Sequence, residues 1–345
     1  MDRLALEQKI TEYCTREQIF GMLRVTHKDT VLYRQEMGYA DCERRIPFTD
    51  ASLFSLYSLS KPFCALGLLK LKDAGLVDLN LHPGYYVPEA AAFDSRVTLR
   101  HLLHHVSGLP DAEQIGEFAA KFAPGYPAFA REHIRELAKY PSFFAPGTDT
   151  KYANINFILP ALVIENVTGD NYADYMAKEI FAPLGMKTAV VDHEKREIPH
   201  RVTGYALKNG VPVPEEKSHN WLLGAGDIVG TADDVYGLNR AIKHRLLLRE
   251  ETWDEVLTAH PINSFGMGCS VYSWHGLRCI HHNGGHIGFR TLHMQLPEED
   301  FDIILLSNSG YGDARSALAE MVYAAFFGEE GKNAEMPEMD KGYIR

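Results

Sequence analysis

The stretch LFSLYSLSKPFCALGLLKL, residues 53–71, places three serines, a lysine and a proline directly before a long apolar run. The apolar residues recur at a helical spacing, which predicts a mostly buried helix. Proline is tolerated in the first helical turn, where backbone N–H groups have no partner, so Pro62 predicts that the helix begins near Ser58. Ser58 and Lys61 then lie one turn apart on the same face of the helix N-terminus.

Ser58-Leu59-Ser60-Lys61 is an S-x-x-K motif, and no other occurs in the sequence. A serine hydroxyl becomes a useful nucleophile when a base takes its proton, and a desolvated lysine beside it can assist this transfer. The positive end of a helix also stabilises developing negative charge. The motif therefore predicts an acylation site. Taken alone, it leaves open a simple N-cap serine followed by a solvated lysine.

Composition limits the classes of function. The chain has 345 residues, of which 46% are hydrophobic and 23% charged, as is typical of globular proteins. No apolar run approaches the roughly 18 residues of a membrane span. Residues 1–20 predict an amphipathic helix rather than a secretory signal. Five cysteines without paired spacing indicate reduced thiols, and we therefore expect a cytoplasmic protein.

The net charge of −11 disfavours nucleic acid as a partner, because binding it requires a basic patch. A small-molecule substrate is the better expectation. The sequence does not indicate an oligomeric state.

Two kinds of periodicity divide the chain. Residues 21–41 alternate apolar and polar positions around a turn and predict a β-hairpin. From about residue 75 to about residue 260, helical periodicity dominates, with proline and glycine as breakers. Residues 265–309 contain short β-rich runs that predict an antiparallel meander, and residues 313–328 predict a final amphipathic helix.

This order of elements predicts an α+β fold in which both ends of the chain build one sheet with helices packed on it. We expect a sheet domain of residues 1–75 plus 262–345 and a helix-rich inserted lobe of residues 76–261. The active site is expected between them.

Two further motifs carry polar groups. Tyr152-Ala153-Asn154, the only Y-x-N of the chain, follows a proline–glycine turn and precedes a predicted helix. His282-Asn283-Gly284 lies between two predicted strands. Each also has a simple structural interpretation, namely a surface tyrosine with a capping asparagine, and glycines that make room in a tight strand.

The order S-x-x-K, Y-x-N, H-x-G resembles that of the serine β-lactamase and penicillin-recognising enzyme family, in particular its class C β-lactamase, DD-peptidase and esterase branch. The segments VTLRHLLHHVSGLPD, IFAPLGMKTA, GAGDIVGTADDV and HNGGHIGF are similar to that family's segments in the same order, over about residues 20–310. The resemblance implies a β-lactamase/transpeptidase-like fold, with an antiparallel sheet flanked by the terminal helices and an inserted helical lobe.

The resemblance also implies roles for individual residues. Ser58 would be the nucleophile that forms an acyl-enzyme, and Lys61 would hold and polarise it. Tyr152 would act as general base toward Ser58 and as proton donor to the leaving group, with its phenol pKa lowered by Lys61. Asn154 would hydrogen-bond the acyl side of the substrate. No cofactor or metal is implied.

On the strand that carries the third motif, the backbone N–H of Gly285 would form an oxyanion hole together with that of Ser58. The missing side chains of Gly284 and Gly285 would let a substrate lie along the strand edge. His282 departs from many β-lactamases, which have a lysine there. A histidine has a reference pKa near 6.5 and is only partly charged at neutral pH, so it offers a weaker cation to a β-lactam carboxylate.

We therefore expect a serine hydrolase that acts on an ester, amide or peptide acyl carbon through an acyl-enzyme, as a β-lactamase-related esterase or amidase. The first alternative is a β-lactamase or a DD-carboxypeptidase-type penicillin-binding protein. The second, of another class, is a non-catalytic ligand-binding protein on the same fold.

Other signals are weaker. Ser218-His219-Asn220 fits the S-x-N pattern that other branches of the family use, and GAGDIVG, residues 224–230, misses the dinucleotide-binding fingerprint and predicts a turn into a helix. His101, His104 and His105 share a helix, but the chain has no H-E-x-x-H, so a structural role is the better expectation. The absence of G-x-S-x-G excludes an α/β-hydrolase elbow.

Overall fold

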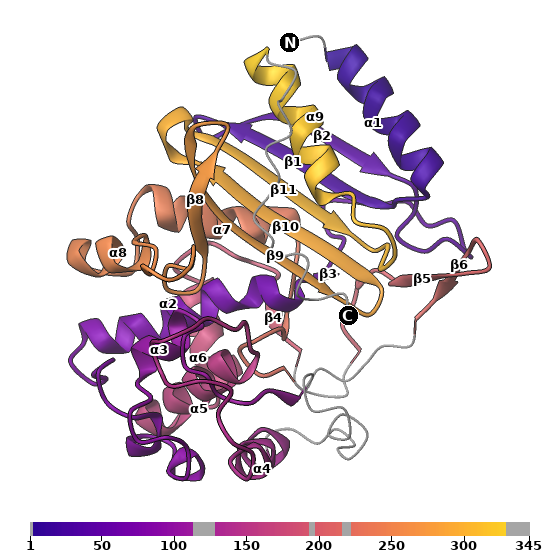
Figure 1. Ribbon diagram of the computed structural model, residues 1–345. Helices are drawn as coiled ribbons and strands as arrows, with labels where there is room; N and C mark the ends of the chain where they lie inside the picture. The colour runs from indigo at the N-terminus through magenta and orange to yellow at the C-terminus, as the bar shows by residue number, and fades with distance from the viewer. Residues whose placement is uncertain (1–2, 113–127, 193–196, 216–221, 329–345) are drawn as a thin grey trace.

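A six-stranded antiparallel sheet is the largest element of the computed structural model, which describes residues 3–112, 128–192, 197–215 and 222–328 (Figure 1). Its strands, in spatial order, are β2 (Thr30–Met37), β1 (Gly21–His27), β11 (Phe301–Ser307), β10 (Phe289–Leu296), β9 (Leu277–His286) and β8 (Ser270–Trp274).

Both ends of the chain meet within this sheet. Strand β1 pairs with β11 from Gly21 opposite Ser307 to His27 opposite Phe301, and its other edge pairs with β2. The hairpin predicted over residues 21–41 and the C-terminal meander are therefore confirmed, as is the α+β class of the fold.

Helices cover both faces of the sheet (Figure 1). Helices α1 (Arg3–Glu17) and α9 (Arg315–Phe327) bury residues such as Leu6 and Leu318 in one hydrophobic core against one face. The opposite face packs against a larger core that contains most of the remaining helices. Because both faces of the sheet are covered, β1 and β11 are buried along nearly their whole length. No helix in the described ranges combines the length and apolar character that crossing a bilayer requires.

The remaining α-helices lie between β2 and β8 in the chain. The α-helices are α2 (Lys61–Asp73), α3 (Leu99–Leu103), α4 (Ala128–Leu137), α5 (Ile155–Thr168), α6 (Tyr172–Met176), α7 (Ala232–Lys243) and α8 (Glu250–Val256). Short helical turns of other types are η1 (Tyr57–Ser60), η2 (Pro83–Tyr85), η3 (Pro88–Ala90), η5 (Ala177–Phe181) and, between β10 and β11, η6 (Pro297–Glu299).

Short strands also interrupt this helical region, and the sequence did not predict them. They are β3 (Phe54–Ser55), β7 (Ile228–Gly230) and β4 (Val190–Val191), which form a small sheet in that order, and the hairpin of β5 (Tyr205–Lys208) and β6 (Val211–Pro214). Strands of two to four residues are too short to show an alternating pattern. The division of the chain at residues 75 and 262 stays a prediction.

Residues 53–71 form β3 and, after Leu56, the turn η1, which runs directly into α2. Pro62 is the second residue of α2, and the residue just before Ser58, Tyr57, has a positive φ of 47°. Such a backbone conformation is uncommon for a bulky residue and persists where the surroundings hold it in place. Ser58 thus lies on a constrained 3₁₀ turn that leads into a buried helix.

Candidate active site

Lys61 and Ser58 contact each other at the junction of η1 and α2. The Lys61 ammonium donates a hydrogen bond to Ser58 Oγ over 3.0 Å. The Lys61 side chain is 0% exposed and Ser58 is 5% exposed. One turn of helix therefore places a hydroxyl directly against a desolvated cation, as the S-x-x-K spacing predicts.

Two further acceptors hold Lys61 in place. Its Nζ donates to Asn154 Oδ1 over 2.8 Å and to the Ala225 carbonyl over 2.7 Å. With Ser58 these provide three acceptors for the three protons of an ammonium, which a buried charge needs. Asn154 precedes α5, and its own backbone N–H donates to Asp111 Oδ2 over 2.6 Å. Three segments that are distant in the sequence thus meet at Lys61, and a fourth, at Asp111, holds Asn154.

Tyr152 lies within the same group. Its ring stacks on the His105 imidazole with centroids 4.2 Å apart, and Lys61 Nζ lies 4.8 Å from the Tyr152 ring centroid. The centroid of the His282 ring lies 6.4 Å from that of the Tyr152 ring. The structure therefore brings together Ser58, Lys61, Tyr152, Asn154 and His282.

The turn that carries Ser58 is fixed to two sheets. The Leu56 carbonyl accepts a hydrogen bond from Thr291 Oγ1 of β10 over 3.0 Å, and the Leu56 N–H donates to the Ile228 carbonyl of β7 over 2.9 Å. Ser60 Oγ accepts from the Ile228 N–H over 3.0 Å. These contacts hold η1 from both sides.

Gly284 of β9 lies against this turn. A Cβ atom on Gly284 would stand 2.0 Å from the Leu56 carbonyl oxygen, whereas one on Gly285 would meet only the side chain of Arg290, at 3.2 Å. The space that Gly284 leaves is therefore filled by the chain itself. The close approach of η1 uses the space on the Cβ side of Gly284. That the missing side chains of Gly284 and Gly285 let a substrate lie along the strand edge stays a prediction.

The two histidines beside Tyr152 are neutral. Burial, and then the charge of Lys61, lowers the pKa of His282 to about 3 and holds the pKa of His105 well below its usual value. His282 Nδ1 lies 2.6 Å from the Asn283 carbonyl, which can only accept, so Nδ1 carries the proton. His105 Nδ1 accepts the Ala153 N–H over 3.3 Å, so its proton is on Nε2. His282 thus supplies no positive charge at neutral pH, where the sequence suggested a partial one.

A buried carboxyl group lies behind Lys61. Burial raises the pKa of Asp227 to about 7, although the backbone N–H of Gly224 donates to Asp227 Oδ2 over 2.8 Å. This hydrogen bond fixes the turn that presents the Ala225 carbonyl to Lys61. GAGDIVG therefore forms a turn and the short strand β7 before α7 begins, rather than a nucleotide-binding loop.

The competing sites gain no support. Ser218-His219-Asn220 lies outside the described residues. His101 accepts the Thr98 N–H in a helix cap, and His104 Nδ1 lies 2.9 Å from the Phe265 carbonyl. In the described part of the chain, no three His, Cys, Asp or Glu side chains are grouped where they could hold a metal ion.

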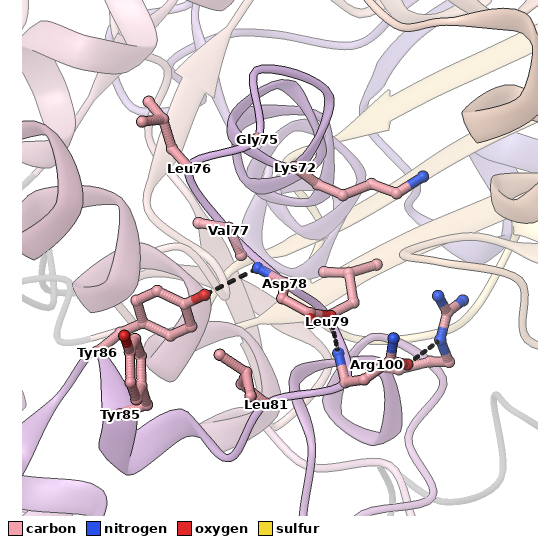
Figure 2. A pocket seen from close by; sticks show the side chains of 11 residues that line it. Lys72, Gly75, Leu76, Val77, Asp78, Leu79, Leu81, Tyr85, Tyr86 and Arg100 are labelled. Carbon is pink, nitrogen blue, oxygen red and sulfur yellow. Dashed lines mark hydrogen bonds between the residues drawn. The ribbon is translucent and has the colours of Figure 1, made fainter.

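A surface hollow of about 440 Å³ lies elsewhere on the molecule (Figure 2). Its lining runs from the end of α2 through the loop at residues 75–81 to Tyr85, Tyr86 and Arg100. The Tyr86 hydroxyl accepts the Asp78 N–H over 2.8 Å across this loop (Figure 2). None of the predicted site residues contributes to the hollow, so it is separate from Ser58.

Several residues of the site were not predicted from the sequence. Asp111 holds Asn154, Thr291 holds η1, and His105 stacks on Tyr152. His105 belongs to the family-like segment VTLRHLLHHVSGLPD, so its position gave a signal, although only a metal role was weighed for it. Asp111 is the last residue of the same segment, whereas Thr291 belongs to none of the segments singled out in the sequence.

Comparison with known proteins identifies the family of this chain. The family model described as Beta-lactamase matches residues 6–326. The chain is 27% identical to penicillin-binding protein 4* of Bacillus subtilis (strain 168), over 85% of this chain and 69% of that protein. It is also 27% identical to a D-aminopeptidase of Gluconobacter oxydans (strain 621H), over 88% of this chain but only 58% of that protein.

Among solved structures, a D-amino acid amidase from Ochrobactrum anthropi SV3, in complex with D-phenylalanine, superimposes with a TM-score of 0.77 at 26% identity. The match covers 93% of this chain and 97% of the amidase. Because the family model spans nearly the whole of the described chain, the chain belongs to the β-lactamase family of serine hydrolases.

Proposed function

We propose that this protein hydrolyses the amide or ester bond of a small amino-acid derivative through an acyl-enzyme on Ser58. The observation that carries the proposal is the 3.0 Å contact of Ser58 Oγ with the buried Lys61 ammonium, which also binds Asn154. The D-aminopeptidase and the D-amino acid amidase among its relatives support an amide as the substrate.

In this mechanism Ser58 Oγ bonds to the acyl carbon while its proton passes to the Tyr152 phenolate. The tetrahedral intermediate collapses, and the amine or alcohol leaves with that proton. A water molecule then attacks the acyl-enzyme, gives a proton back through Tyr152 to Ser58, and releases the acid. The N–H groups of Ser58 and Gly285 stabilise the oxyanion in both steps.

Penicillin-binding or β-lactamase activity is the second candidate, because one relative is named a penicillin-binding protein. A β-lactam carries a carboxylate that a cation would bind. His282 has a pKa lowered to about 3 by burial and by Lys61, so it offers no such charge at neutral pH. This weighs against β-lactams as the natural substrate.

For the compartment we propose the cytoplasm. All five cysteines are free thiols, as expected in a reducing environment.

Intact mass spectrometry after brief exposure to a p-nitrophenyl ester, and separately to a penicillin, tests the proposal. We expect the wild type to gain the mass of the acyl group from the ester, and Ser58→Ala to gain none. Ser60→Ala is the matched control, because Ser60 is equally buried in the same turn but hydrogen-bonds the Ile228 N–H. This control should still be acylated.

The outcomes separate the candidates. Preferential labelling by penicillin would favour the second candidate. If neither reagent labels the wild type and no p-nitrophenol is released, the non-catalytic ligand-binding alternative replaces the proposal.

A further inference from the structure

An ion pair between a buried arginine and a more exposed aspartate lies behind the strand that carries the H-x-G motif. Arg315, the first residue of α9, donates from Nε to Asp313 Oδ1 over 2.8 Å, and its Nη2 donates to Asp313 Oδ2. The Arg315 side chain is 7% exposed. Helix α9 packs on the face of the sheet opposite the core that contains Leu56 and Leu59 of the Ser58 turn. Arg315 therefore approaches β9 from the side away from Ser58.

The third contact of this guanidinium reaches the backbone of β9. Arg315 Nη1 donates to the Gly284 carbonyl over 3.3 Å. That carbonyl belongs to the same peptide group as the N–H of Gly285, which the proposed mechanism places in the oxyanion hole. A planar peptide transmits a constraint on its C=O directly to its N–H.

In the described chain this peptide group is paired within the sheet on one side, where Gly284 lies opposite Thr291 and Gly285 opposite Arg290 of β10. Two successive glycines have more backbone freedom than any other pair and no side chains to pack. Strand β8 pairs with β9 only as far as Ser270 opposite His281, so beyond that point β10 is the strand paired with β9 in the described chain. A further hydrogen bond to the Gly284 carbonyl therefore restricts the orientation of this peptide group.

The ion pair makes this donor directional. Burial alone would raise the pKa of Asp313, but the hydrogen bonds and charge of Arg315 outweigh it and leave that pKa below its usual value. The carboxylate therefore occupies two donors of a rigid planar fork, which fixes the direction of the third. Hydrogen bonding at a carbonyl also polarises the peptide and strengthens its N–H as a donor.

We propose that Arg315 is a positioning residue that orients and polarises the Gly284–Gly285 peptide, so that the Gly285 N–H stabilises the oxyanion. The proposal rests on the acyl-enzyme function given above. Arg315 acts through the backbone and does not touch the substrate.

The test compares Arg315→Gln and Arg315→Lys with Arg24→Gln. Arg24, on β1 of the six-stranded sheet, is a matched control. It is also a buried arginine, with a side chain 8% exposed, and it pairs with an aspartate, Asp233. With a p-nitrophenyl ester, we expect both Arg315 variants to lose about ten- to a hundredfold in kcat with KM nearly unchanged, since losing an oxyanion donor outright costs about 10²–10³. Arg24→Gln should lose stability but keep its kcat.

Amide hydrogen exchange provides a readout independent of turnover. A peptide that spans residues 282–289 should exchange faster in Arg315→Gln than in Arg24→Gln at equal overall stability. Wild-type kcat in Arg315→Lys, or equal exchange in the two glutamine variants, would overturn the role of Arg315. Failure of the wild type itself to form an acyl-enzyme would instead count against the proposed function.

Discussion

Lys61 and its neighbours show how one buried charge organises the site. Its ammonium has three acceptors, from Ser58, Asn154 and Ala225. The nearby imidazoles of His105 and His282 are neutral, because burial and the charge of Lys61 both disfavour a second cation. The positive charge of this group of residues therefore belongs to Lys61, next to the proposed nucleophile.

The neutrality of His282 predicts how the enzyme treats charged substrates. Burial and Lys61 lower the pKa of His282 to about 3, so the ring stays uncharged throughout the range between about pH 5 and 8. Two p-nitrophenyl esters of equal chain length, one with a terminal carboxylate, should therefore show a ratio of kcat/KM values that does not change with pH across this range. A ratio that rises on acidification, with a midpoint near the ordinary histidine pKa of about 6.5, would show that His282 becomes charged.

The site residues that the sequence predicts lie in short motifs of a few neighbouring positions in the chain. Ser58 and Lys61 are one helical turn apart, and Tyr152 and Asn154 lie just before the start of α5, so their spacing alone gives a signal. Arg315 binds a carbonyl 31 positions earlier, through a contact that only the sheet and α9 together create. No local pattern encodes such a contact.

At the scale of elements, the 3₁₀ turn η1 is fixed between β7 and the β9–β10 hairpin. Tyr57 keeps its positive φ while its hydroxyl donates to the Ile287 carbonyl over 3.2 Å and its ring packs edge-on to His286. The helix and the hairpin were predictable from periodicity and turn residues. Their close approach was not, because it depends on the absence of a side chain at Gly284, which the sequence permits but does not require.

Gly284→Ala tests this approach. The new Cβ would lie 2.0 Å from the Leu56 carbonyl, which is backbone and cannot rotate away, so η1 must move. We expect a loss of about 1–3 kcal/mol in the free energy of unfolding, the usual range for overpacking, together with loss of ester hydrolysis. Urea denaturation and the p-nitrophenyl assay measure the two effects.

Gly285→Ala is the matched control for stability. Its Cβ would meet only the Arg290 side chain, at 3.2 Å, and that side chain can shift. Its unfolding free energy should stay much closer to that of the wild type. Equal destabilisation by the two alanines would mean that the contact with Leu56 is not what makes position 284 require glycine.

At the scale of the whole molecule, two cores on opposite faces of one sheet bury many ionisable groups. Such burial could not be foreseen, because a histidine within an apolar run has the same sequence signal whether it is buried or exposed. Burial lowers the pKa of nine described histidines, His82, His101 and His286 among them. The shift is largest in six: to about 4 for His104 and His133, to about 3 for His282 and His293, and well below the usual value for His105 and His281. Burial raises the pKa of two aspartates, Asp227 and Asp302, to about 7.

These shifts predict unfolding in mild acid. Below the unfolded histidine pKa of about 6.5, the histidines of the unfolded chain bind protons, whereas the buried imidazoles of the folded state stay neutral. The free energy of unfolding therefore decreases as the pH is lowered, by about 2 kcal/mol per such histidine at pH 5. The two aspartates act in the opposite direction, since the folded state takes up their protons below about pH 7. Six groups outweigh two, so the urea midpoint should fall steeply between pH 6.5 and 5, while the protein is most stable near neutrality.

His293→Leu isolates one contribution. His293 is fully buried on β10, directly opposite His282, and burial lowers its pKa to about 3. On unfolding between pH 6.5 and 5, the wild type takes up a proton at His293 that the variant cannot take up. The unfolding free energy of the variant should therefore decline less steeply over this pH range. The exposed His244 gives the control variant His244→Gln, which should keep the wild-type slope. If His293→Leu also keeps that slope, buried imidazoles are not what limits the acid stability of this protein.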